Sequence, residues 1–144
     1  MLDRLLGLLG GGTTPAREEP SEQLAVALLL LELARSDFDV PEVEINKVRD
    51  LLAQRYQLDP AQAEALLQQA QATEQEAVSL FDYVKTLNAR LDNAAKREVM
   101  QMLWQVAYAD GRLDKYEESL LRKLAGLLYV SDEDYIRAKL SVTG

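Results

Sequence analysis

Two stretches of this chain decide its fold: LARSDFDVPEVE at residues 33–44 and VAYADGRLDKYE at residues 106–117. Each stretch leaves an apolar helical pattern, passes through an acidic loop and reaches a glutamate seven positions after an aspartate. The identical positions keep one constant separation along the chain (34 to 107, 37 to 110 and 44 to 117). The correspondence predicts an internal duplication.

The match continues beyond the loops at the same separation. The further corresponding pairs are Val40 and Leu113, Val48 and Leu121, Leu51 and Leu124, and Tyr56 and Tyr129. We therefore expect a tandem helix, acidic loop, helix unit. Its two apolar helices, at 21–35 and 93–109, should pack together and bring both acidic loops to one end of the molecule.

Apolar residues recur at helical spacing from Ser21 onward, and no stretch alternates as a strand does. Ser21 and Asp59 are suited to capping helix starts, and Asp59 is followed by Gln62 in a capping-box pattern. The fold class is predicted to be all-α, a single compact bundle of about seven helices. The expected helices cover residues 21–35, 41–56, 59–72, 78–91, 93–109, 115–128 and 132–140.

Residues 1–20 read as a separate region, and residues 21–144 as the helical domain. Leu2, Leu5, Leu6 and Leu9 are spaced for a short amphipathic helix, and the glycines and prolines that follow favour a flexible linker. The apolar run is too short to cross a bilayer. Docking on the domain, disorder, and membrane contact through residues 1–9 remain alternatives.

Composition excludes several classes of function. The formal charge of the chain is -8, which opposes binding to nucleic acid. Histidine and cysteine are both absent, so thiol nucleophiles, imidazole bases and Cys/His zinc sites are excluded. We expect no enzyme and no catalytic residue, and the absence of cysteine fits a cytoplasmic protein.

The two acidic loops are the candidate metal site, because hard divalent cations such as calcium and magnesium prefer oxygen ligands. The candidate ligands are Asp37, Asp39, Glu44, Asp110, Asp114, Glu117 and Glu118. Neither loop is an EF-hand, since Val48 and Leu121 stand where the bidentate glutamate is required. Helix capping and compensation of the helix dipole explain the same residues equally well.

Two other features have simple structural interpretations. Trp104, with Met100 and Met102 on the same segment, is expected in the core or at an interface rather than at a cofactor. The basic pair Lys96 and Arg97 is expected on a solvated helix face.

The duplicated Ala, Asp-Gly-like loop and Glu pattern, with the Trp104 segment and the helix after Ser131, resembles the tellurite-resistance TerB-like family over residues 21–140. Phe38 departs from this pattern, because it stands where the second loop has Gly111. The family's fold is also similar to the N-terminal domain of the DjlA membrane co-chaperone. The resemblance implies an all-helical acidic module linked to stress or tellurite resistance, which binds divalent metal in some members.

Three classes of function remain open. The first is a metal-binding, stress-linked module, and the second is a protein-interaction domain that uses a helical face. A carboxylate-based metallohydrolase is the third, and it fits least well because such sites commonly recruit histidine. The sequence does not specify the metal, the protein partner or the oligomeric state.

Overall fold

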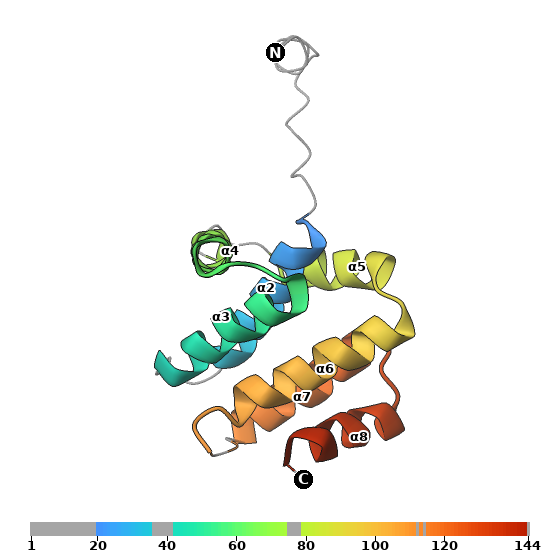
Figure 1. Ribbon diagram of the computed structural model, residues 1–144. Coiled ribbons are helices and arrows are strands. Elements are labelled where there is room, and N and C mark those ends of the chain that lie inside the picture. The colour runs from blue at the N-terminus through green and yellow to red at the C-terminus, as the bar shows by residue number, and fades with distance from the viewer. Residues whose placement is uncertain (1–19, 36–41, 75–78, 112, 114, 144) are drawn as a thin grey trace, which may run out of the picture.

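The computed structural model describes residues 20–35, 42–74, 79–111, 113 and 115–143, and these residues form an all-helical bundle without strands (Figure 1). The predicted fold class is confirmed, and all seven expected helices lie within a few residues of their expected bounds. They are α2 (Glu22–Ala34), α3 (Glu42–Tyr56), α4 (Pro60–Glu74), α5 (Leu80–Arg90), α6 (Asn93–Ala107), α7 (Lys115–Leu127) and α8 (Asp132–Thr143).

The helix starts are fixed by the caps that the sequence predicts. The Ser21 hydroxyl accepts a hydrogen bond from the Leu24 amide at 3.2 Å. Asp59 and Gln62 form a reciprocal capping box, with distances of 2.8 and 3.0 Å between side-chain oxygens and backbone amides. Such caps satisfy amides that have no partner within the helix, so α2 and α4 begin directly after Ser21 and Asp59.

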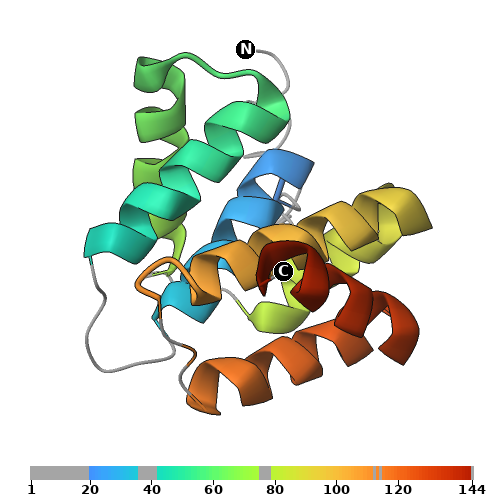
Figure 2. The same ribbon diagram turned by 60° about the horizontal axis from the view of Figure 1, so that its bottom comes forward.

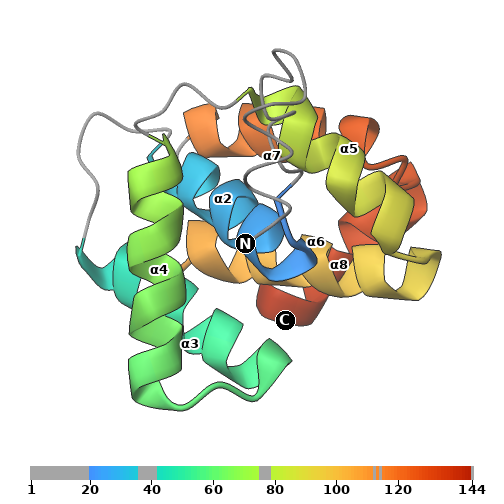
Figure 3. The same ribbon diagram turned by 90° about the horizontal axis from the view of Figure 1, so that it is seen from above.

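Helix α2 is the centre of the bundle. Every residue from Leu24 to Leu31 is buried, as are Leu33 and Ala34. Helices α3, α4, α5, α6 and α7 all contact α2, and Figure 3 shows it between α4 and α5. A helix that is apolar on all sides is stable in water only when neighbours cover every side. Within the described part of the chain, no helix is both long and apolar enough to cross a membrane.

The structure confirms the duplication at the ends of α2 and α6. The residue after α2, Arg35, has φ -96° and ψ 5°, and its equivalent after α6, Tyr108, has φ -96° and ψ 7°. The Arg35 amide donates to the carbonyls of residues 31 and 33, and the Tyr108 amide to those of residues 104 and 106. Each acceptor is therefore separated from its counterpart by the offset of the sequence repeat, and α2 and α6 pack together as expected.

The equivalence stops at the ends of α3 and α7. Tyr56 is the last residue of α3, and its hydroxyl donates to Glu22 at 2.8 Å. Tyr129 lies beyond α7 in a left-handed turn with φ 58° and is largely exposed. The first unit makes the same kind of turn at Gln57, one position later in the repeat. The sequence match of Tyr56 with Tyr129 is therefore not a structural one.

The described helix ends beside the two acidic loops lie at one end of the molecule. Figure 2 shows the end of α2, the start of α3, the end of α6 and the start of α7 on the left side, and Figure 3 agrees. Helices α6 and α8 pack together, and both begin at the opposite end. Trp104 of α6 is fully buried beside Tyr135 of α8, which places it in the core as expected.

Two glycines in the second unit give a matched test of backbone geometry. Gly111 has φ +83°, whereas Gly126 lies within α7, and a Cβ atom at either position would meet no other atom within 4 Å. We predict that Gly111→Ala lowers the free energy of unfolding by about 1 kcal/mol, because the left-handed region disfavours a Cβ atom. Gly126→Ala should raise it by about 0.5–1 kcal/mol. Urea titrations measure both changes, and an equal response of the two positions would contradict the assigned geometry.

Candidate metal-binding loops

The predicted metal ligands fall into two groups in the structure. Asp37, Asp39 and Asp114 lie outside the described residues. Glu44, Asp110, Glu117 and Glu118 are described, and all four lie at or next to the helix starts and ends that flank the two loops. The positions of these four residues agree with the prediction that both loops lie at one end of the molecule.

Glu44 and Glu117 are equivalent in position and in burial. Each is the third residue of its helix, α3 or α7, and they are only 1% and 2% exposed. A carboxylate in the first turn is favoured by the positive end of the helix dipole. Removing a carboxylate from water is costly, and the helix dipole offsets part of this cost at both positions.

The other two described candidates are more accessible. Asp110 is exposed and precedes Gly111, whose amide donates to the Tyr108 carbonyl at 2.9 Å to close the turn after α6. Glu118 is half-buried on α7. The left-handed φ of Gly111 explains why an Asp-Gly pair suits this turn.

The described residues alone do not complete a metal site. Among residues 20–35, 42–74, 79–111, 113 and 115–143, no three acidic side chains are grouped so that they could hold a metal ion. The donor chemistry fits a hard cation, because all the candidate ligands are carboxylates. A full ligand set requires side chains from outside these residues, and the metal site therefore stays a prediction.

Sequence reasoning missed a polar cluster beside the end of α2. The Arg35 guanidinium pairs with Glu74 of α4 at 3.3 Å, and the Tyr83 hydroxyl of α5 donates to Glu32 at 3.4 Å. Burial raises the pKa of Glu74, Arg35 opposes the shift, and the charge of Glu32 adds to it. Burial and the nearby carboxylates also raise the pKa of Tyr83. The feature of the sequence that could have indicated this cluster is Glu32, the single charged residue in the apolar run of α2.

A surface groove lies beside the acidic end. It has a volume of about 590 Å³ and lies between α3, the end of α6 and the end of α8. Its walls combine Val43 and Val142 with Lys47, Asp50 and Gln105. The mixed lining is compatible with a polar ligand or a peptide segment and does not resemble an apolar cofactor pocket.

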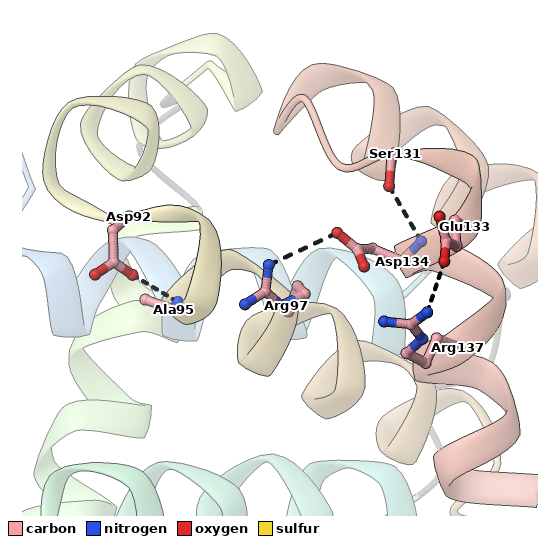
Figure 4. A network of polar contacts seen from close by, with 7 residues as sticks. All are labelled: Asp92, Ala95, Arg97, Ser131, Glu133, Asp134 and Arg137. Atoms are coloured by element: carbon pink, nitrogen blue, oxygen red, sulfur yellow. Dashed lines mark hydrogen bonds and ion pairs between the residues drawn. The ribbon is translucent and has the colours of Figure 1, made fainter.

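Another polar network joins α6 and α8 at the opposite end of the molecule (Figure 4). Asp92 accepts a hydrogen bond from the Ala95 amide at 2.8 Å, and Arg97 pairs with Asp134 at 3.8 Å. Lys96, which was expected on a solvated face together with Arg97, is only 8% exposed. The prediction was wrong for Lys96, because its side of α6 meets the turn that precedes α8.

The fold and the acidic loops define a duplicated, all-helical acidic domain. The profile of the family described as tellurite resistance protein TerB matches residues 23–140, and the chain belongs to this family. No curated protein and no solved structure matches the chain. The family match confirms the resemblance seen in the sequence, whereas the similarity to the DjlA domain remains an expectation.

The raised pKa of Glu74 generates a pH-dependent prediction. A carboxyl group with a raised folded-state pKa favours folding at low pH, and this contribution is lost as the pH rises through the folded pKa. As the pH rises from 4 to 7, the stability of Glu74→Gln relative to that of the wild type should therefore increase. Thermal unfolding at both pH values measures the difference. Glu64→Gln, which removes another arginine partner at a more exposed site, is the control. A Glu74→Gln gain that is larger at pH 4 would contradict the assignment.

Proposed function

We propose that this TerB-family domain is a non-enzymatic, cytoplasmic module that binds a divalent cation, calcium or magnesium, and acts in stress or tellurite resistance. The observation that carries the proposal is the pair Glu44 and Glu117. Both carboxylates are buried at equivalent positions of the duplicated unit, and both lie in the first turns of helices that start at the same end of the molecule.

Charge explains why a cation suits this end. Folding buries two carboxylates, and Asp110 after α6 and Glu118 on α7 are further acidic residues at this end, in a chain whose formal charge is already -8. Acidic residues at one end of a folded domain repel one another, and a bound cation would relieve this repulsion. The proposed site draws its remaining ligands from Asp37, Asp39 and Asp114.

The choice of metal follows from the donor atoms. Carboxylate and carbonyl oxygens suit calcium, magnesium and manganese, whereas zinc and copper favour imidazole and thiolate ligands. This chain has neither histidine nor cysteine. The same lack of imidazole and thiol groups supports binding as the function, because hydrolytic metal centres commonly recruit histidine.

The metal proposal predicts a stabilisation that depends on the acidic loops. At about 100 times its dissociation constant, calcium or magnesium should stabilise the wild type by about 2.7 kcal/mol at constant ionic strength. Asp110→Asn combined with Glu117→Gln should abolish this gain, because the site loses one exposed ligand, Asp110, and one buried ligand, Glu117. Differential scanning calorimetry with and without the metal measures the effect.

The control changes the same number of charges at the other end of the molecule. Asp132→Asn combined with Glu133→Gln neutralises two exposed acids in the first turn of α8 and should preserve the metal response. If the acids of the loops serve only as helix caps, the Asp110/Glu117 variant loses about 1 kcal/mol without metal and the wild type gains nothing from it. That result would contradict the proposed site.

A protein-interaction role is the second candidate, and the outer face of α8 favours it. Ile136 is 42% exposed and Leu140 is 56% exposed. The two residues lie one helical turn apart, so they share one face of the helix. Exposed apolar side chains on one helix face are suited to binding another protein.

Substitution of this face tests the interaction role. Replacing both Ile136 and Leu140 with serine should change the free energy of unfolding by less than about 0.5 kcal/mol, because both side chains are substantially exposed. Affinity capture with the wild type and the double variant as bait compares their partners. Loss of a protein partner that the wild type retains would support this role, and unchanged capture would exclude this face.

A further inference from the structure

Helix α8 ends the described part of the chain, and it is held through one narrow face. Tyr135 and Ala138 are the buried residues among the 12 of α8, and Val142 is partly buried. These three positions lie on one stripe of the helix. Among the described helices, α6 is the principal neighbour of α8, and Figure 1 shows α8 beneath it. The contacts of α8 with the rest of the protein are therefore concentrated in a single seam with α6.

The polar groups of this seam hold α8 only weakly. The indole nitrogen of Trp104 and the hydroxyl of Tyr135 are buried, and neither has a hydrogen-bond partner among the described residues. Arg97 and Asp134 pair at 3.8 Å, a long separation for an ion pair. A buried polar atom without a partner costs free energy. Separation of α8 from α6 would give both atoms access to water and so recover part of the free energy lost with the apolar contacts.

The turn that joins α7 to α8 is short and holds one residue in an unfavourable conformation. It covers residues 128–131, and Tyr129 within it has φ 58°. The amides of Tyr129 and Val130 donate to the carbonyls of residues 126 and 125 at 3.1 and 2.9 Å, so the chain turns sharply after α7. Glycine is the usual residue at such a position, because a Cβ atom is disfavoured in the left-handed region. Straightening of the turn would release Tyr129 from this region.

We propose that two copies of this chain exchange α8, so that the α8 of each copy packs against the α6 of the other. The exchanged helix makes the same contacts with Trp104 that the chain's own α8 makes, because the two surfaces are the same in both arrangements. The exchange therefore loses no contact of the seam, and its main cost is the entropy of association. A short hinge under strain favours such an exchange, which is a low-cost route to a dimer.

Exchange also changes the surface groove beside the acidic end. The walls of this groove include Lys47 of α3, Gln105 of α6, and Ser141 and Val142 of α8. In the exchanged dimer, the α8 wall of each groove comes from the second copy, so each groove is completed by two chains. The exchange uses the inner face of α8. It is therefore independent of the proposed metal site and of the apolar outer face of this helix.

Cross-linking across the seam tests the exchange, because the chain has no cysteine of its own. Arg97→Cys and Asp134→Cys place single thiols on the two paired side chains of the seam. The two full-length variants are refolded together from urea at high protein concentration and treated with a short bifunctional thiol reagent. Exchange should give a covalent dimer that contains one chain of each kind, identified by mass spectrometry. Absence of this mixed dimer, or as much dimer from each variant alone, would overturn the proposal.

Variants of the hinge test the role of its strain. Tyr129→Gly and Tyr129→Ala both remove the aromatic ring, but only glycine also removes the Cβ atom. Tyr129→Gly should lower the yield of exchanged dimer at least about fivefold relative to Tyr129→Ala, because the closed turn suits glycine. Gln57→Gly changes the same kind of turn between α3 and α4 and should leave the yield within about twofold of the wild type. Circular dichroism confirms folding of each variant. Equal yields from the two Tyr129 variants, or an equal fall with Gln57→Gly, would contradict the proposed hinge.

Discussion

The burial of α2 on every side is the constraint on which the rest of the structure depends. Because this helix offers almost no polar surface, the bundle must supply a neighbour for each of its faces, and α3 to α7 do so. Glu32 is the charged exception. It is accommodated by Tyr83, and the nearby Glu74 is held by Arg35. The arrangement of the bundle therefore follows from covering one apolar helix.

Much of this arrangement was predictable because it is encoded locally. Caps and helical spacing predicted the seven helices, and the constant separation of the duplicated stretches predicted the matching ends of α2 and α6. The match of Tyr56 with Tyr129 failed because the turn after α7 begins one residue earlier in the repeat than the turn after α3. A residue's place in a left-handed turn depends on where its helix ends, which residue identity alone does not determine.

The candidate site was predicted less completely than the fold. Sequence spacing identified Glu44 and Glu117 as equivalent, but it did not distinguish these buried carboxylates from the exposed Asp110. The burial of Lys96 was predicted wrongly for a related reason. Which side of α6 is covered depends on the packing of α8, and this contact joins segments that are separated in the chain by the whole of α7. Composition within one helix carries no information about such a contact.

The seam between α6 and α8 also has an optical consequence. The only tryptophan of the chain, Trp104, is fully buried in this seam, with its ring centre 5.2 Å from that of Tyr135 and 6.0 Å from that of Tyr108. Its emission therefore originates from a single, solvent-shielded environment at the boundary of α8. Detachment of α8 would admit water to the indole and shift that emission to longer wavelength while α2 stayed enclosed. The indole is thus a built-in spectroscopic reporter that distinguishes local opening of α8 from unfolding of the whole core.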